Sequence, residues 1–326
     1  MNFKKLSVIG IILVAVILIF CLKGNNDNSA DPPLPTVQST TEESSQPSDT
    51  DTNNSSDEDT SEENNSDASG YSFRNADFYC IETDELLFQY NSDEKLHPAS
   101  LVKILTAATA LYYVDSEAEF TVGTELSLLQ PRSSVCLIRK GHRLTLGQLI
   151  EGMLLASGND AAYTIAVNVA RTVIGENLSD SEAVSFFCEL MNSFARLIGM
   201  KNSNFTSPDG YDDENQYTTA EDLLILTKCA LTVPVIKETV SLSQKHVIFR
   251  SGENITWQNT NKLLSSGTHY NKYAVGMKTG TTNNAGNCLI AVFEKDDMTY
   301  ISIVCGAETS DSRYKDTNRL FDTYSK

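Results

Sequence analysis

The sequence is poor in the residue patterns that metal centres use. Its 326 residues include four histidines and seven cysteines, but no two cysteines have the Cys-x-x-Cys spacing typical of zinc and redox sites. The histidines do not cluster with the cysteines along the chain. We therefore expect no metal site in this protein.

Positive charge is scarce as well. The chain has 25 Lys and Arg against 43 Asp and Glu, a net charge of −18 at pH 7. From residue 71 onward, 22 basic residues stand against 31 acidic ones, a net charge of −9. Proteins that bind nucleic acid need a basic surface, so this composition argues against a nucleic acid partner.

Residues 24–70 contain no Lys or Arg, but they include 12 acidic residues among Ser, Thr, Asn and Pro. Such a segment cannot bury enough apolar surface to fold, and its charges repel one another. We expect a disordered acidic linker over residues 23–70, rich in Ser, Asn and Asp. A specific binding tail is the alternative interpretation.

One long apolar run occurs, LSVIGIILVAVILIFCL over residues 6–22, and it follows Lys4 and Lys5. Its 17 residues are about the shortest helix that spans a bilayer. The two lysines predict a cytoplasmic tail over residues 1–5. We expect a single-pass anchor in the cell membrane that places the rest of the chain outside the cytoplasm. A cleaved signal peptide and lipidation of Cys21 are the alternatives.

Residues 71–326 are long enough for one large folded domain. Strands are predicted around 76–82, 86–90, 245–249, 273–278, 288–294 and 299–306. Helices are predicted over 100–113, 146–155, 161–173, 181–197, 219–231 and 311–324. Because strands from both ends enclose a helical middle, we predict an α+β fold with a largely antiparallel sheet, flanked by helices and carrying a helical subdomain.

Three local features of this domain also carry predictions. Thr145 is expected to cap the helix at 146–155, and the stretch 218–221 fits a capping box for the helix at 219–231. The domain's cysteines allow 15 pairings, and we favour mostly buried thiols because each lies in an apolar segment. These cysteines are Cys80, Cys136, Cys188, Cys229, Cys288 and Cys305.

The stretch HPASLVKILTA, residues 97–107, places Lys103 in an apolar helical pattern one turn after Ser100. A lysine in a core is costly unless it is paired or neutral. Residues three apart share one side of a helix, so the amine can reach the hydroxyl and act as a base for a serine nucleophile. A capping serine beside a lysine that extends to solvent is the alternative. A second Ser-x-x-Lys, at 92–95, lies in a charged turn and carries no such prediction.

Two further polar stretches interrupt apolar surroundings. Ser157-Gly158-Asn159 separates two helical patterns, so it must be a tight connection that presents polar groups. Lys278-Thr279-Gly280-Thr281 closes a strand pattern, and Gly280 would let a ligand approach the backbone closely. Each stretch alone is better explained as a loop or a strand end.

The motifs Ser-x-x-Lys, Ser-Gly-Asn and Lys-Thr-Gly occur in this order in penicillin-recognising serine enzymes. With them, the sequence resembles the D-alanyl-D-alanine carboxypeptidases, the low-molecular-mass penicillin-binding proteins. The likeness extends over nearly all of residues 71–326. It includes the stretches ETDELLFQYNSDEKLHPASLVKILTA, LTLGQLIEGMLLASGNDAA, LMNSFARLIGMKNSNFTSPDGYDD, NTNKLL and VGMKTGTTNNAGNCLIAV. The glycine after Ser157 and the lack of Glu-x-x-Leu-Asn favour this family over the class A β-lactamases.

The resemblance implies a fold and a set of catalytic residues. The fold would be that of the penicillin-binding and β-lactamase-like transpeptidases, with a five-stranded sheet and a helical subdomain. Ser100 would be the acylated nucleophile, and a neutral Lys103 its general base. Ser157 would pass a proton to the leaving amine, helped by Lys278.

The resemblance also implies a substrate-binding set. Asn159 would bind the amide carbonyl of the substrate. The backbone N–H groups of Ser100 and Thr281, beside Gly280, would stabilise the oxyanion. Lys278, Thr279 and Arg313 would hold the terminal carboxylate. For Arg313, which matches the family by position alone, a surface charge is the alternative.

The activity implied is removal of the terminal D-alanine from peptidoglycan stem peptides at the cell-wall side of the membrane, without metal or cofactor. β-Lactam antibiotics would acylate the same serine. The alternatives are a β-lactamase, a β-lactam or muropeptide sensor, and a peptidoglycan-binding module without catalysis. Two departures from the family, Gln216 in QYTTA and Ser207 in SPDG, bear on substrate detail rather than reaction class. We also expect the N-terminal apolar run to replace the C-terminal anchor of many relatives.

Overall fold

The computed structural model describes residues 65–175 and 178–326. Within these ranges, no helix is both long enough and apolar enough to cross a membrane. The tail, the apolar run and nearly all of the linker that the sequence predicts fall outside the described residues, so these expectations stay predictions.

A five-stranded antiparallel sheet joins the two ends of the domain. Its strands lie in the order β2-β1-β9-β8-β7, so the N-terminal hairpin pairs with the C-terminal strand β9. The strands are β1 (Asn75–Cys80), β2 (Glu85–Tyr90), β7 (Ala274–Thr282), β8 (Gly286–Lys295) and β9 (Met298–Ala307). The prediction of a largely antiparallel sheet built from both ends of the domain is confirmed.

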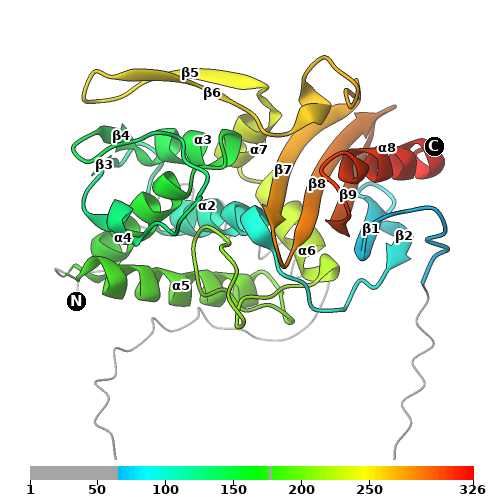
Figure 1. The fold of residues 1–326 in the computed structure, drawn as a ribbon, viewed down its shortest axis with the longest axis horizontal. Helices are drawn as coiled ribbons and strands as arrows, with labels where there is room; N and C mark the ends of the chain where they lie inside the picture. Colours follow the sequence, from blue (N-terminus) through cyan, green and yellow to red (C-terminus); the bar gives the residue numbers. More distant parts are fainter. Residues whose placement is uncertain (1–64, 176–177) are drawn as a thin grey trace, which may run out of the picture.

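The sheet is buried on both faces, and this explains the continuous apolar sequence of its central strands. Along β8, Ile290 and Val292 pack with the helical part of the molecule, while Leu289 and Phe293 pack on the opposite face. The C-terminal helix α8 (Ser312–Tyr324) covers that opposite face (Figure 1). The sheet is therefore the middle of three layers.

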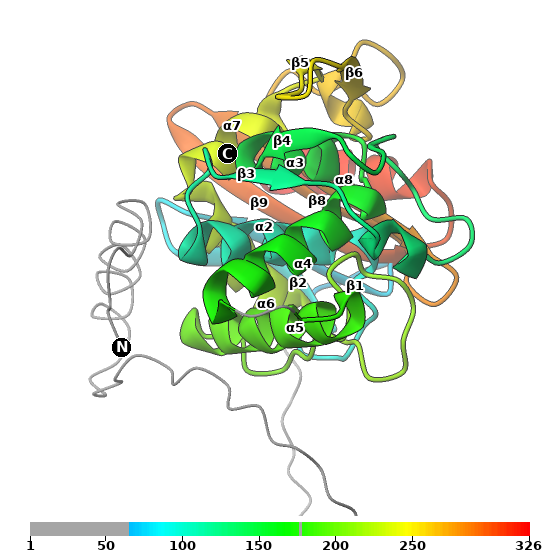
Figure 2. The ribbon, with the colours of Figure 1, turned by 90° about the vertical axis from the view of Figure 1, so that its left-hand side faces the viewer.

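The helical part fills the middle of the chain. Figures 1 and 2 show its helices gathered on the side of the sheet opposite α8. These helices are α2 (Val102–Tyr113), α3 (Leu146–Leu155), α4 (Asn159–Ile174), α5 (Asp180–Leu197), α6 (Ala220–Leu231) and α7 (Pro234–Ser241). Two small two-stranded sheets lie beside them, β3 (Glu119–Thr121) with β4 (Arg143–Thr145) and β5 (Gln244–Ile248) with β6 (Asn254–Gln258). The predicted helical subdomain is thus confirmed.

The capping predictions have different outcomes. Thr145 caps α3 as predicted, because its hydroxyl accepts the Gln148 N–H in a complete capping box. For α6 the prediction was wrong by one residue, since Thr219 is the N-cap and accepts from Asp222 N–H. Thr218 is unavailable because its backbone pairs with that of Leu96 in an isolated bridge.

The cysteine prediction is confirmed. All six cysteines of the described ranges are free thiols; five are buried and Cys229 is partly buried. Helix α7 and strands β3, β4 and β6 are not among the predicted elements.

Candidate active site

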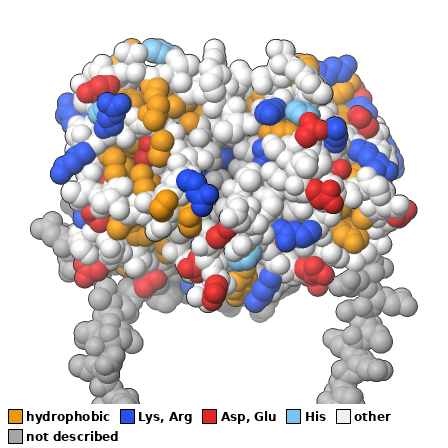
Figure 3. Space-filling view, viewed as in Figure 1, with side chains coloured by type: hydrophobic (Ala, Val, Ile, Leu, Met, Phe, Trp, Pro, Cys, Tyr) orange, Lys and Arg blue, Asp and Glu red, His pale blue; other side chains and the backbone are white. Residues whose placement is uncertain are grey.

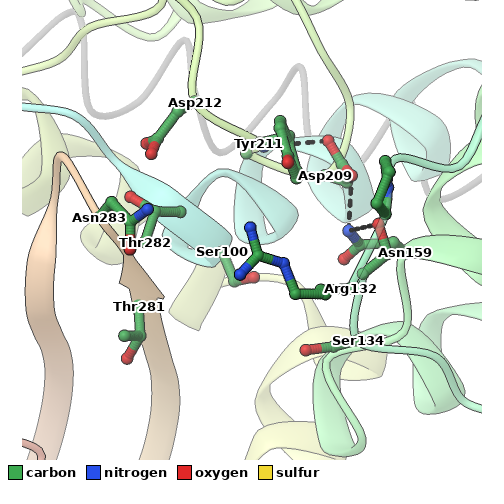
Figure 4. Close-up of a pocket in the computed structure, with 13 residues that line it drawn as sticks. Ser100, Arg132, Ser134, Asn159, Asp209, Tyr211, Asp212, Thr281, Thr282 and Asn283 are labelled. Atoms are coloured by element: carbon green, nitrogen blue, oxygen red, sulfur yellow. Dashed lines mark hydrogen bonds between the residues drawn. The ribbon is translucent and has the colours of Figure 1, made fainter.

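Three segments that are distant in the sequence meet at one edge of the sheet. They are the start of α2, the connection between α3 and α4, and strand β7. A cavity of about 300 Å³ opens there and is lined by Ser100, Asn159 and Thr281 among others. Figure 3, drawn from the same direction as Figure 1, shows a hollow near the middle of the molecule's surface. Figure 4 shows the side chains around the cavity. The structure thus brings the three predicted motifs together.

Ser100 and Lys103 lie side by side, as the spacing predicts. Ser100 sits in a 3-10 turn, Ala99–Leu101, that leads directly into α2. The Lys103 amine donates hydrogen bonds to Ser100 Oγ at 2.7 Å and to the backbone carbonyl of Asp209 at 2.6 Å. Lys103 is fully buried, so its side chain does not extend to solvent. The alternative of a lysine that extends to solvent is therefore wrong.

The surroundings of Lys103 make its amine easier to deprotonate. Burial lowers the pKa of Lys103 to about 8, although the carboxylates of Asp209 and Asp160 oppose the shift. A lysine with such a pKa is partly deprotonated near neutral pH. Its amine can then accept the proton of the Ser100 hydroxyl.

Ser157 and Lys278 form a second pair across the site. The Lys278 amine donates to Ser157 Oγ at 2.9 Å and to the Thr279 carbonyl at 2.9 Å. Burial holds the pKa of Lys278 well below its ordinary value, and the charges of Lys103 and Arg313 lower it further. Ser157 has φ +58°, a left-handed backbone that is strained for a non-glycine residue and aims its hydroxyl at β7.

Asn159 is held by two neighbours. Its side-chain amide donates to Asp209 Oδ2 at 2.6 Å and to Ser133 Oγ at 3.1 Å. Asp209 also accepts from the Ser207 hydroxyl and the Tyr211 N–H. The Asp209 carboxylate therefore fixes Asn159 while its backbone carbonyl fixes Lys103.

Sequence reasoning did not single out Asp209. It lies in the stretch SPDGYDD, which resembles the family but predicts no role for any one residue. A buried carboxylate on a loop has no local sequence signal. The one hint was its place between Pro208 and Gly210, a turn pattern that fixes the backbone rather than naming a partner.

Two glycines allow these segments to come close. A Cβ on Gly280 would lie 3.0 Å from Ala99 Cβ and 3.2 Å from the Ser100 nitrogen. A Cβ on Gly210, whose φ is +84°, would overlap the Ala99 carbonyl. The turn that carries Ser100 is therefore clamped between β7 and the Asp209 loop.

Thr279 and Arg313 are both held at β7 by hydrogen bonds. The Thr279 hydroxyl shares a hydrogen bond with Thr260 at 2.7 Å. The Arg313 guanidinium donates to the Gly280 carbonyl at 3.1 Å and to the Thr281 hydroxyl at 3.0 Å. Arg313 is only 7% exposed, so its interpretation as a surface charge is wrong. Arg313, at the start of α8, therefore holds the Gly280–Thr281 part of β7.

Residues 78–309 match the family described as D-alanyl-D-alanine carboxypeptidase. This match spans most of the chain and all three motifs. The chain belongs to this family. The resemblance seen in the sequence is therefore confirmed.

Curated relatives come from several bacteria. D-alanyl-D-alanine carboxypeptidase DacC of Escherichia coli is 34% identical over 249 residues, which cover 72% of this chain and 57% of that protein. D-alanyl-D-alanine carboxypeptidase DacF of Bacillus subtilis is 29% identical over 244 residues, covering 74% of this chain and 59% of that protein. This chain thus spans somewhat more than half the length of these relatives.

Solved structures share the fold. The DD-transpeptidase of Streptomyces K15 superposes with a TM-score of 0.70 at 25% identity, covering 77% of this chain and 96% of that one. Penicillin-binding protein D2 of Listeria monocytogenes, solved in its ampicillin-bound form, has a TM-score of 0.63 at 28% identity and covers 79% and 99%. The predicted penicillin-binding fold is confirmed.

Among residues 65–175 and 178–326, no group of three or more His, Cys, Asp or Glu side chains is arranged to hold a metal ion.

Proposed function

We propose that this chain is a serine-type D-alanyl-D-alanine carboxypeptidase, which removes the terminal D-alanine from peptidoglycan stem peptides through an acyl-enzyme on Ser100. One observation carries the proposal. The buried amine of Lys103 lies 2.7 Å from Ser100 Oγ, at the point where the Ser-Gly-Asn and Lys-Thr-Gly segments also meet. Family membership and the names of the relatives support it.

In the acylation step, neutral Lys103 accepts the proton of Ser100 while Oγ attacks the carbonyl carbon between the two D-alanines. The bond from that carbon to the nitrogen of the last D-alanine then breaks. Ser157, hydrogen-bonded to Lys278, would give its proton to the departing amine and regain one from the protonated Lys103, which leaves Lys103 neutral again. Free D-alanine leaves, and the rest of the peptide stays esterified to Ser100.

The remaining residues hold the substrate. Asn159 would donate to the peptide carbonyl on the acyl side of the scissile bond. The backbone N–H groups of Ser100 and Thr281 would stabilise the oxyanion, an effect commonly worth about 3–4 kcal/mol per donor. Lys278, Thr279 and Gly280 would line the path of the terminal carboxylate, and Arg313 would act on it through Thr281.

Water completes the cycle. In a carboxypeptidase, water would then attack the ester carbonyl while the neutral Lys103 accepts one of its protons. The ester bond to Ser100 breaks, and Lys103 gives this proton to Ser100 Oγ, so both side chains return to their starting state. β-Lactams would acylate Ser100 in the same way but leave slowly, and the ampicillin-bound relative supports this expectation.

We propose the following arrangement for the whole chain. Residues 1–5 form a cytoplasmic tail, 6–22 a membrane-spanning anchor, 23–70 a disordered acidic linker and 71–326 the catalytic domain. The supporting observation for the anchor is the uncharged apolar run that two lysines precede. The active site would then work at the cell-wall side of the membrane.

The test is D-alanine release from a peptide ending in Lys-D-Ala-D-Ala, measured for the full chain and for Ser100→Ala. We expect release by the wild type and none by the variant. Stable labelling of Ser100 by penicillin without D-alanine release would contradict the proposal and indicate a sensor. Rapid penicillin turnover without D-alanine release would indicate a β-lactamase.

A further inference from the structure

One exposed loop of this acidic protein carries only positive charge. Between Glu125 and Glu151 the sequence has no Asp or Glu, but it has four basic residues. These four lie on residues 131–143, here called the basic loop, and each is exposed: Arg132, Arg139, Lys140 and Arg143. The whole chain has a net charge of −18, so the basic loop is opposite in sign to the chain as a whole.

The charges of the basic loop have no ion-pair partners. Among the residues that the structure describes, none of its four basic side chains forms a salt bridge, and the Arg143 guanidinium donates only to the Arg250 carbonyl, at 3.4 Å. Acidic side chains of adjoining segments have partners of their own. Glu117 and Glu119 pair with Arg250, and Glu253 accepts a serine hydroxyl. The basic loop therefore presents uncompensated positive charge to solvent.

The basic loop also forms one wall of the Ser100 cavity. Residues 131–134 line this cavity, and Figure 4 shows Arg132 extending across it, with the guanidinium in front of Ser100 in that view. The Asn159 N–H donates to the Ser134 carbonyl at 2.8 Å, which holds the loop against the site. A polyanion bound to the basic loop would therefore lie at the mouth of the active site.

The sequence itself supplies a segment of the opposite charge. Residues 24–64 include 11 acidic residues and no basic ones. They precede Asn65, which is fixed beside the end of β2 because its side-chain amide donates to Asn91 Oδ1 at 3.2 Å. The charge of this acidic segment complements that of the basic loop.

The acidic segment is long enough to reach the basic loop. Four of its acidic residues lie 22 or more positions before Asn65: Asp27, Asp31, Glu42 and Glu43. An extended chain of that length spans about 75 Å. A domain of this size is about 45–50 Å across, so half of its circumference is about 75 Å as well. These four carboxylates can therefore reach any point on the surface of their own domain.

Attachment to the same chain favours this contact over one between two copies. A tether of a few tens of residues gives an effective concentration on the order of 1 mM, far above that of a second copy in dilute solution. An exposed ion pair contributes little alone, but several pairs on one tethered segment act together. A segment needs no fold of its own to bind through charge, and such binding weakens as salt is added.

We propose that the acidic segment, residues 24–64, binds the basic loop of the same chain and covers the mouth of the Ser100 cavity. Bound there, its carboxylates would repel other anions, so that it slows the acylation of Ser100 by anionic reagents such as penicillins. High salt would release the segment and open the cavity. This contact within the chain goes beyond the proposed reaction and does not depend on it.

The first experiment detects the contact itself by carbodiimide cross-linking of the full chain, which joins a carboxylate to a lysine amine. Lys140 is the one lysine of the basic loop, and the exposed Lys201, outside the loop, is the internal control. The variant Lys140→Arg keeps the charge but removes the reactive amine. Digestion and mass spectrometry then identify which lysines are joined to the acidic segment.

We expect cross-links from the acidic segment to Lys140 at least about threefold more often than to Lys201 at about 20 mM salt, and no such preference at about 0.5 M. In a mixture of ¹⁵N-labelled and unlabelled chains, both halves of each cross-linked pair should carry the same isotope. Equal cross-linking of Lys140 and Lys201 at low salt would overturn the inference. Pairs of mixed isotope would overturn it too, because they would place the contact between copies.

The second experiment measures the effect on Ser100 through two sets of substitutions. The linker set changes all 11 acidic residues of the acidic segment to Asn or Gln. The loop set is Arg139→Gln, Lys140→Gln and Arg143→Gln, and it leaves the cavity residue Arg132 in place. The rate of Ser100 labelling by a fluorescent penicillin is measured for the wild type, each set and both sets together.

At about 20 mM salt, the linker set should speed labelling about threefold in the wild-type background and leave the rate unchanged in the loop-set background. Long-range repulsion by the acidic segment would act in both backgrounds, so equal acceleration in both would overturn the inference. A loop that binds lipid instead would give no preference for Lys140, and the loop set would lose binding to phosphatidylglycerol vesicles. If penicillin labels no variant, the proposed function fails while the cross-links still decide this inference.

Discussion

The Lys103 amine and the Asp209 backbone carbonyl are joined by a 2.6 Å hydrogen bond, although 106 residues separate them in the chain. The same aspartate orients Asn159 through its carboxylate. One loop residue therefore positions members of two motifs. The side chains of Lys103 and Asn159 therefore keep their relative positions only while the loop that contains Asp209 keeps its conformation.

Acylation of Ser100 should depend on pH through Lys103. Because burial lowers the pKa of Lys103 to about 8, the rate of penicillin labelling should rise with pH and level off above that value. Lys103→Arg, which cannot become neutral, should slow labelling by about 10²–10⁴-fold across the range. Lys95→Arg, in the other Ser-x-x-Lys stretch, is the control and should behave as wild type. Labelling by Lys103→Arg at the wild-type rate would show that Lys103 is not the base.

Asp209→Asn should change both rate and pH profile. The carboxylate raises the pKa of Lys103, so removing its charge should shift the midpoint of the labelling profile to lower pH. Loss of the charge-assisted bond to Asn159 should lower kcat/KM for D-alanine release by about tenfold. Asp213→Asn, on the exposed end of the same loop, is the matched control. An unchanged midpoint in Asp209→Asn would contradict the electrostatic role.

Gly210→Ala should be far more costly than Gly252→Ala. Both glycines have positive φ, but a Cβ at Gly210 would overlap the Ala99 carbonyl, whereas nothing lies within 4 Å of one at Gly252. We expect Gly252→Ala to lose about 1 kcal/mol of unfolding free energy, the cost of the backbone conformation. Gly210→Ala should lose roughly 3 kcal/mol or more and label slowly with penicillin, because the Ser100 turn must shift. Urea unfolding of both variants measures this, and equal losses would refute it.

Asp77 should make the fold less stable as pH rises. Burial raises the pKa of Asp77 to about 7, so the folded protein retains a proton that the unfolded chain releases from about pH 4 upward. The wild type should lose on the order of 4 kcal/mol relative to Asp77→Asn between pH 4 and pH 7, and little more above that.

Urea unfolding of wild type and Asp77→Asn at several pH values isolates this group, since the other titrations cancel in the difference. Asp93→Asn, an exposed neighbour, should show no such trend. A difference between wild type and Asp77→Asn that does not vary with pH would mean that Asp77 is ionised in the folded protein.

The motif residues could be predicted from the sequence because their signals are local. Lys103 stood out as a charge in an apolar helix, and Ser100 was one turn away. The sheet followed from alternating and continuous apolar runs in strands such as β8. Helix α7 was missed because its eight residues include four that are β-branched and it begins at Pro234, a pattern that also fits a loop.

The position of Asp209 between Lys103 and Asn159 could not be predicted because it depends on the tertiary structure. Asp209 lies on a loop, where the sequence shows turn residues and charges but not what faces them. Arg313 had a weak signal, and its burial beneath β7 became visible only with the sheet register that pairs Gly280 with Cys288.

The most direct test of the account is the site of acylation. The full chain is incubated with a penicillin, digested, and analysed by mass spectrometry, with Lys103→Arg treated in parallel. We predict that the adduct mass lies on the peptide containing HPASLVK, at Ser100, and that it forms far more slowly in Lys103→Arg. An adduct on another residue, or an unmodified Ser100 after prolonged exposure, would contradict the assignment of Ser100 as the nucleophile.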